Sequence, residues 1–335
     1  MSIRTTEPPL QGIVIKKTTG QYDVHTAGRT ITCVPPKHSQ KESAPSGKNS
    51  RRGDKKAFRA GADAIETIAI GDVVRFIEVP GRPATIIDVL PRQSRLSRRA
   101  VVTGSQLVEQ VIVANVDQVV PVFAAARPAP HWNMLDRYLV AAESHNLPSL
   151  ICITKLDLVQ SEGGQIDEEI LDAMEEYRRI GYTVHLVCAE TGEGIDGLRE
   201  ALHGRTSVMV GKSGVGKTTL LNALQPGLGQ KVNAVSEGKL GKGRHTTTHL
   251  EMFPLEGGEG AIVDTPGVRE FGLWDVDPDE MALFFPEMAP YVGRCRFGLG
   301  CAHDDEPGCA VRKAVVAGAI SPRRYQSYMR LKQEA

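Results

Sequence analysis

The segment GKSGVGKTT, Gly211–Thr219, constrains this chain more than any other feature of its sequence. It matches the pattern G-x-x-x-x-G-K-[ST] and lies between an apolar strand pattern, TSVMV, and a helical one, TLLNAL. In that context glycines let backbone N–H groups surround a phosphate, the lysine reaches the β and γ phosphates, and the threonine hydroxyl holds Mg²⁺. The residues expected to line this nucleotide site are Gly211, Lys212, Ser213, Gly214, Val215, Gly216, Lys217, Thr218 and Thr219.

This loop lies late in the chain, although a phosphate-binding loop ordinarily opens its domain. The chain has 335 residues, of which 41% are apolar, and this suits two or three domains. Lysine plus arginine equal aspartate plus glutamate at 40 each, so that no global field favours nucleic acid. No apolar run is long enough for a spanning helix, and the start lacks a secretory signal. We expect a soluble, cytoplasmic monomer without a membrane partner.

Three regions differ in pattern. Residues 1–97 hold five short strand patterns, which predict a small antiparallel barrel, interrupted by a basic low-complexity loop at 37–61. Residues 98–273 alternate apolar strands with amphipathic helices, which predicts a parallel sheet covered on both faces. Residues 274–335 hold helical patterns that begin at Asp277 and Ser321, each followed by proline. A multidomain chain with a β-barrel, an α/β domain and a helical domain is therefore expected.

Two motifs after the phosphate loop fit a γ-phosphate and its magnesium ion. DTPG ends the strand pattern GAIVD, where Asp264 is placed to bind magnesium through water and the Gly267 N–H to meet the γ-phosphate. A turn that ends a strand is the alternative. Between the loop and DTPG lies GKGRHTTTHLEM, in which Thr246 or Thr247 is a candidate second magnesium ligand beside Thr218. The alternative there is a threonine-rich start to a strand.

The candidate base-reading motifs lie before the phosphate loop. TKLD, Thr154–Asp157, follows the strand pattern LICI, and Asp157 is placed to accept from guanine N1–H and the exocyclic amine while Lys155 lies along the loop. A carboxylate left unpaired by adenine costs ~1–3 kcal/mol, so one aspartate selects guanine. CAE follows a later strand, where the Ala189 N–H after Cys188 is placed to contact guanine O6. Alone, each motif also fits an ordinary strand-to-helix loop.

Four metal-ligand side chains lie within fifteen residues near the C-terminus: Cys295, Cys301, His303 and Cys309. Three thiolates and one imidazole form a complete tetrahedral set for one structural zinc ion. An iron–sulfur site and free thiols are the alternatives. The remaining cysteines, Cys33, Cys152 and Cys188, lie singly in apolar strand patterns and are expected to be small buried hydrophobes in a reducing compartment.

The motifs occur in the order base-reader, base-reader, phosphate loop, threonine loop, DTPG, which is a circular permutation of the guanine-nucleotide set. With a barrel before them and a Cys-rich tail after them, the chain resembles the ribosome small-subunit-dependent GTPase A (RsgA) family over about residues 11–330. The resemblance implies an N-terminal OB-fold, a central circularly permuted P-loop GTPase domain and a C-terminal zinc domain. It implies binding of the small (30S) subunit and its 16S rRNA during late maturation, with GTP hydrolysed to GDP and release coupled to hydrolysis.

The chain departs from the family pattern at several positions. The usual Asn of N-K-x-D is Thr154, the Ser of the S-A motif is Cys188, and one residue more than expected separates Cys295 from Cys301. The 37–61 loop looks like an insertion. Val268 stands where Ras-like enzymes carry a water-positioning glutamine, which predicts a slow intrinsic rate.

The family resemblance points to His245 as the residue that orients the attacking water, and it implies that the small ribosomal subunit stimulates GTP hydrolysis. The alternative for His245 is a solvent-exposed loop histidine. Three basic groups are candidates for RNA phosphates, namely Lys48–Arg59, Arg92–Arg99, and a tail group of Arg312, Lys313, Arg323 and Arg324. For any one group alone the alternative is a solvated face, and together with an OB-like barrel they favour RNA. Two other functions stay open. A small-molecule P-loop kinase leaves TKLD, CAE and the permuted order as coincidences, and a passive nucleotide switch on an RNA-binding module is kept open by Val268.

Overall fold

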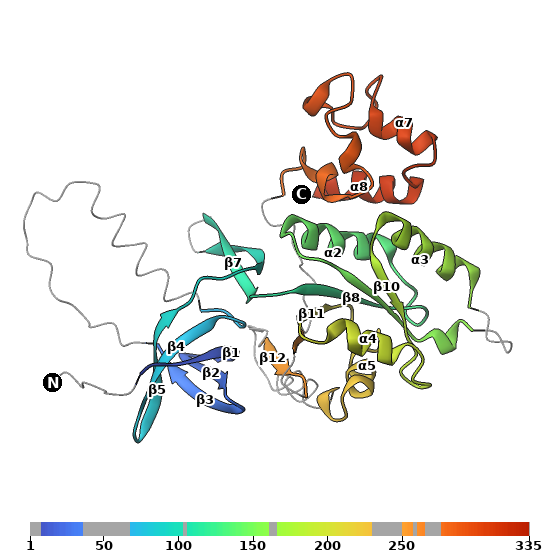
Figure 1. The fold of residues 1–335 in the computed structure, drawn as a ribbon. Coiled ribbons are helices and arrows are strands. Elements are labelled where there is room, and N and C mark those ends of the chain that lie inside the picture. Colours follow the sequence, from blue (N-terminus) through green and yellow to red (C-terminus); the bar gives the residue numbers. More distant parts are fainter. Residues whose placement is uncertain are drawn as a thin grey trace, which may run out of the picture.

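The computed structural model describes residues 8–35, 68–102, 106–160, 166–229, 250–256, 260–264 and 276–334. Figure 1 shows three parts along the chain: an N-terminal barrel, a central sheet with helices on both faces, and a C-terminal unit of short helices. The multidomain architecture expected from the sequence is confirmed. The predicted loop at 37–61 lies outside the described residues.

Five strands form the barrel: β1 Leu10–Thr18, β2 Gln21–Thr26, β3 Arg29–Val34, β4 Val73–Val79 and β5 Arg82–Val89. Their order is β1-β2-β3-β5-β4, and β4 pairs with β1 to close the barrel around a core that includes Val14, Val24 and Phe76. One pairing, β3 with β5, is parallel, so the expectation of a wholly antiparallel barrel was wrong. The reason is that these strands are not consecutive, and local patterns do not determine the pairing of non-consecutive strands.

A two-stranded hairpin connects the barrel to the central domain. It pairs β6, Arg95–Val102, with β7, Gln106–Ala114. The predicted boundary between residues 97 and 98 falls within β6. The three domain ranges therefore stay predictions. The hairpin is a sheet of its own, whereas the barrel and the central strands form one continuous sheet through the pairing of β1 with β12, Glu251–Pro254.

The central sheet has the order β10-β9-β8-β11-β13-β12. Its strands are β8 Gln118–Ala124, β9 Leu150–Thr154, β10 Thr183–Leu186, β11 Thr206–Val210, β12 Glu251–Pro254 and β13 Ala261–Asp264. All neighbours are parallel except β12, which runs antiparallel to β13. Strands β8, β9 and β13 are buried along their whole length, as a sheet covered on both faces requires.

Helices cover the two faces of this sheet (Figure 1). Helices α2, Trp132–Ser144, and α3, Glu168–Ile180, lie on one face, and α4, Ile195–Leu202, and α5, Lys217–Leu224, lie on the other. Alternate strand residues enter two cores. Along β8, Val119 and Phe123 pack in the core beneath α2 and α3, whereas Val120 and Val122 pack in the core beneath α4 and α5.

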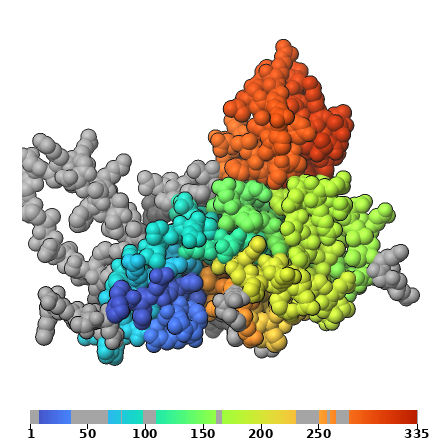
Figure 2. Space-filling view, in the orientation of Figure 1, coloured from blue at the N-terminus to red at the C-terminus, as the bar shows by residue number. Residues whose placement is uncertain are grey.

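The C-terminal unit consists of 3-10 turns η2 Met281–Phe284, η3 Ala289–Tyr291 and η4 Gly298–Gly300, followed by α7 Ala310–Val316 and α8 Pro322–Glu334. The helix expected after Asp277 is only the short η2, whereas the Ser321 hydroxyl caps α8 by accepting from the Arg323 N–H at 3.2 Å. Figure 2 shows this unit, in orange and red, standing on the central domain. Among the described helices, none has the length and apolarity that crossing a membrane requires.

A buried ion network joins the C-terminal unit to the central domain. Asp136 of α2 and Arg324 of α8 are fully buried, and the guanidinium donates to Asp136 Oδ1 at 2.6 Å. Arg324 also donates to Glu287 Oε1 at 2.6 Å, and Arg323 donates to Glu176 Oε2 at 2.6 Å. The prediction that Arg324 contacts RNA phosphate was therefore wrong, because its charge is neutralised in the protein interior. No local sequence pattern indicates this burial, since both acidic partners lie far away along the chain.

Candidate functional site

The fold brings the sequence motifs to one edge of the central sheet. Thr154 ends β9, Gly211 follows β11, Asp264 ends β13 and Cys188 follows β10 within two residues. These strands are parallel, so their carboxyl ends meet at the same edge. Ligands of open α/β sheets bind at this edge. Elements that are dispersed along the chain thus form one candidate nucleotide site, in the permuted order read from the sequence.

The phosphate loop has the backbone geometry that its glycines permit. Gly214 and Gly216 have φ of +83° and +91°, and a Cβ at Gly211 would lie 2.4 Å from the Val122 carbonyl oxygen. The Lys217 amino group donates to the Gly211 carbonyl oxygen at 2.6 Å. Burial lowers the pKa of Lys217, and the charge of Asp264 partly opposes this shift. The ammonium group therefore lies across the loop, where a phosphate can replace the carbonyl as its partner.

The TKLD segment contacts the phosphate loop directly. The Thr154 hydroxyl lies 2.5 Å from the Val215 carbonyl oxygen and 3.2 Å from that of Phe123. The Lys155 amino group donates to the Gly214 carbonyl oxygen at 2.6 Å, from a residue with φ of +60°. A base held by TKLD and phosphates held by the loop would therefore belong to the same ligand. Thr154 makes these contacts although the family pattern has Asn at this position.

Asp157 and Cys188 lie side by side. The buried Cys188 thiol donates to Asp157 Oδ1 at 3.4 Å, whereas the aspartate itself is exposed to solvent in the 3-10 turn η1, Leu156–Leu158. This contact orients the carboxylate. The sequence predicted only a backbone contact beside Cys188, from the Ala189 N–H, and the contact of the Cys188 thiol with Asp157 was missed. The one signal for that contact is that Cys, like Ser, carries a donor hydrogen. The other two single cysteines, Cys33 and Cys152, are buried as expected.

Some of the expected site residues belong to the described part of the chain and others do not. His245, Thr246, Thr247, Gly267 and Val268 lie outside the described residues. Two of the expected magnesium ligands, Asp264 and Thr218, are described. Asp264 is buried at the end of β13, and it pairs in register with Met209 of β11, which lies two residues before the phosphate loop. Thr218 lies in the first turn of α5. The roles of all these residues stay predictions.

The four metal-ligand side chains of the tail form one buried cluster: Cys295, Cys301, His303 and Cys309. Their ligand atoms lie within 4.8 Å of one another. The Cys295 and Cys309 sulfurs are 3.9 Å apart, and His303 Nδ1 lies 3.5 Å and 3.6 Å from them. A tetrahedral zinc ion with ordinary bond lengths needs edges of about 3.8 Å between sulfurs and about 3.6 Å between sulfur and nitrogen. The cluster therefore fits zinc, despite the longer spacing between the first two cysteines.

The polypeptide around the cluster supports thiolate ligands. The Ala310 N–H donates to the Cys295 sulfur at 3.2 Å, and the Arg312 N–H donates to the Cys309 sulfur at 3.4 Å. Burial raises the pKa of Cys295, but the N–H groups of Ala310 and Val311 and the neighbouring Cys301 and Cys309 thiols outweigh burial, so that the pKa lies below its ordinary value. Burial, by contrast, raises the pKa of Cys301 and of Cys309, so that one thiol of the cluster is favoured as the first thiolate. Helix α8 fixes the ligand loop, because the Tyr325 hydroxyl donates to the His303 carbonyl oxygen at 2.6 Å.

Comparisons with known proteins bear directly on this arrangement. The model of the RsgA GTPase family matches residues 89–274. The chain belongs to the RsgA GTPase family. A curated relative from Gemmatimonas aurantiaca, named small ribosomal subunit biogenesis GTPase RsgA, is 42% identical over 325 residues, which cover 96% of each chain. A relative of the same name from Chlorobaculum tepidum is 40% identical over 331 residues, covering 96% of this chain and 97% of the relative.

Solved structures share the fold. The crystal structure of YjeQ from Thermotoga maritima is 29% identical, covers 98% of each chain and superimposes with a TM-score of 0.68. A second structure, described as YloQ, a circularly permuted GTPase, has a TM-score of 0.67 at 24% identity and covers all of this chain and 97% of its own. The barrel, permuted central domain and C-terminal unit of this RsgA family member therefore recur as one architecture.

Proposed function

We propose that this chain is a GTPase that binds the small ribosomal subunit and hydrolyses GTP to GDP during late maturation of that subunit. The proposal rests on one observation above all, the convergence of TKLD, the phosphate loop and Asp264 at one edge of the sheet. The names of its full-length relatives support the ribosomal part. A small-molecule P-loop kinase would leave TKLD, CAE and the permuted order as coincidences.

The site residues have distinct roles in this proposal. Asp157, oriented by the Cys188 thiol, accepts from guanine, and the Ala189 N–H meets O6. The loop amides and Lys217 hold the phosphates, while Thr218, Asp264 and one of the two adjacent switch threonines hold Mg²⁺. GTP with Mg²⁺ in the sheet-edge site and one structural zinc ion in the tail cluster are the proposed ligands.

Binding to the ribosomal subunit is proposed to use its 16S rRNA, and release follows hydrolysis. Ion pairs within the protein reduce the number of described basic side chains that can contact RNA phosphates. Arg92 is bound to Asp72 at 2.6 Å, and Arg95 to Glu109 at 2.7 Å, so these two charges are partly neutralised. Lys313 stays exposed on α7, whereas Arg312 lies 3.5 Å from Asp305. Salt-dependent affinity is expected, since phosphate contacts release counterions.

Turnover in the presence of small ribosomal subunits tests the proposal. We expect slow GTP hydrolysis by the purified chain, strong stimulation by the subunits, and loss of that stimulation as salt rises. His245→Ala is expected to leave GTP affinity unchanged and to lower stimulated turnover by about 100-fold, because it removes the proposed water-orienting group.

A matched control replaces another histidine, the exposed His203 that follows α4, with alanine and should keep stimulated turnover. Unstimulated turnover at every salt concentration would refute the ribosomal proposal and favour a passive switch. Normal stimulated turnover in His245→Ala would refute only the assignment of that histidine.

A further inference from the structure

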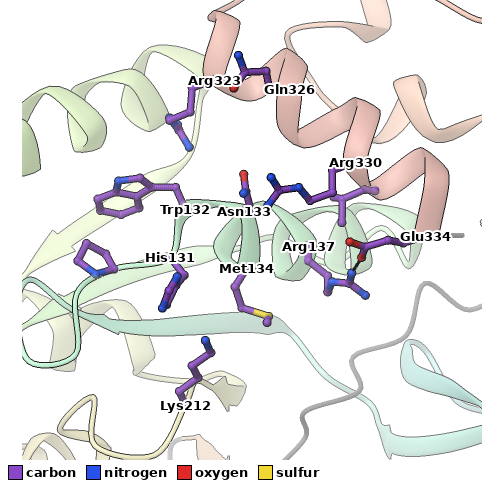
Figure 3. Close-up of a pocket in the computed structure, with 12 residues that line it drawn as sticks. His131, Trp132, Asn133, Met134, Arg137, Lys212, Arg323, Gln326, Arg330 and Glu334 are labelled. Atoms are coloured by element: carbon purple, nitrogen blue, oxygen red, sulfur yellow. Dashed lines mark ion pairs between the residues drawn. The ribbon is translucent and has the colours of Figure 1, made fainter.

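A cavity of about 470 Å³ lies between the phosphate loop, the start of α2 and the outer face of α8. Figure 3 shows Lys212 pointing from the loop toward α2, while Arg330 points from α8 toward Asn133 of the same helix. The central domain and the C-terminal unit therefore meet at this cavity, next to the phosphate loop. Of the phosphate-loop residues, Lys212 alone lines the cavity, and no proposed nucleotide contact uses its side chain.

The cavity carries an excess of positive charge. Four cationic side chains line it and a single carboxylate does so; these are Arg137, Lys212, Arg323 and Arg330, with Glu334. Glu334 pairs with Arg137, and Arg323 pairs with Glu176. Within the part of the chain that the structure describes, the Lys212 amino group and the Arg330 guanidinium make no ion pair or hydrogen bond. These two cationic groups thus face the cavity without a partner among the described residues.

The start of α2 adds to this charge. The first turn of α2 holds no acidic residue, and His131 at its N-cap makes no side-chain hydrogen bond to it. The partial positive charge of a helix N-terminus therefore faces the cavity undiminished. An adjacent cavity of about 740 Å³, which shares Trp132 and Arg323, is lined instead by four carboxylates: Glu169, Asp172, Glu176 and Glu287. The charge of the first cavity is thus a local arrangement, in a chain whose net charge is zero.

We propose that this cavity binds a phosphate group, which Lys212, Arg330 and the first turn of α2 hold together. Phosphate suits the site because it accepts several hydrogen bonds from charged donors at once. The group comes either from an RNA backbone or from free phosphate. A bound phosphate would link α8 to the phosphate loop, so that ligand contact is felt at the nucleotide site. This inference goes beyond the proposed function and does not require GTP hydrolysis.

Trp132 supplies the reporter for the test. The chain has two tryptophans, so Trp274→Phe leaves Trp132, which lines the cavity, as the only fluorophore of its kind. The protein is saturated with GDP and Mg²⁺ to fill the phosphate loop, and is titrated first with inorganic phosphate and then with a ten-nucleotide RNA that carries a 5′-hydroxyl. Binding is expected to change the Trp132 fluorescence.

Two variants decide the outcome. Arg330→Glu is expected to weaken binding by about tenfold or more, because it replaces a charged donor with a repelling group. Asn133→Asp is expected to weaken binding as well, although an acid in the first turn stabilises a helix, so unfolding does not explain that loss. Arg178→Glu on α3 makes the same charge change as Arg330→Glu outside the cavity and should leave binding unchanged.

The two titrations, with inorganic phosphate and with RNA, distinguish the two sources of the phosphate group. Weaker binding of RNA in both cavity variants, with unchanged GDP affinity, supports the site and assigns it to an RNA backbone. Weaker binding of inorganic phosphate alone supports the site and assigns it to free phosphate. RNA and phosphate affinities that do not change in either variant, or that change equally in Arg178→Glu, overturn the proposal.

Discussion

Replacement of Cys309 by serine is expected to abolish tight zinc binding and to unfold the C-terminal unit. Structural zinc contributes about 10–16 kcal/mol to the folding of small metal domains, and the cluster joins η4 to the N-terminus of α7. The segment that carries the ligands adds little apolar burial of its own, since Phe297 and Leu299 are exposed, whereas the buried apolar side chains of the unit, such as Met281, Phe285 and Tyr328, lie outside that segment. Loss of the ion would therefore detach the ligand loop from α8.

Metal analysis and limited proteolysis measure this effect. The unmodified chain is expected to hold about one zinc ion. Cys309→Ser should hold almost none and should be cut readily after residue 276. Cys33→Ser, which changes a buried cysteine in the barrel, is the control and should keep the full metal content. Iron in place of zinc, or unchanged zinc and protease resistance in Cys309→Ser, would contradict the assignment.

Replacement of Arg324 by methionine is expected to lower the free energy of unfolding by about 3–5 kcal/mol, because it removes the cation that pairs with both Glu287 and Asp136. Asp136 keeps the more distant Arg323, at 3.5 Å, and the Tyr177 hydroxyl. The side chain is fully buried, and its guanidinium also stacks 4.6 Å from the centre of the Phe285 ring. Methionine keeps much of the volume while removing the charge. Urea unfolding measures this loss of free energy, with the transition of the C-terminal unit as the signal that is monitored.

Arg330→Met, on the exposed face of the same helix, is the matched control and should change stability by less than about 0.5 kcal/mol. A second test replaces the charges together. Arg324→Met combined with Asp136→Leu and Glu287→Leu should recover most of the lost stability, because no buried charge is then left unpaired. An Arg324→Met variant as stable as the parent would mean that the network does not hold the two domains together.

The sequence predicted those features that depend on residue type and on position relative to a strand. Asp264 and Gly211 had to come together once their strands were parallel, and the Cys295 to Cys309 spacing already contained a complete ligand set. Helix α8 began where Ser321 predicted it. Each of these inferences needs only local chemistry and one general rule about sheets.

Contacts between distant segments were not predictable in this way. Arg324 had the same local sequence signature as an RNA-binding arginine, and only the placement of α8 against α2 shows that it is buried. The thiol of Cys188 meets Asp157 because two strand ends adjoin, which the spacing of the residues does not specify. The parallel pairing of β3 with β5 likewise depends on closure of the barrel. Long-range packing decides all three features.

The proposed function requires that Asp157 selects guanine over adenine, and the preference of the protein for GTP over ATP is the most direct test of this role. We would measure kcat/KM for GTP and ATP with the parent chain, with Asp157→Asn, and with Asp172→Asn on α3 as the control. We expect a preference for GTP of about 100-fold in the parent and the control, which Asp157→Asn loses because its side chain no longer matches the guanine donors. A preference for ATP, or a preference for GTP that survives in Asp157→Asn, would contradict it.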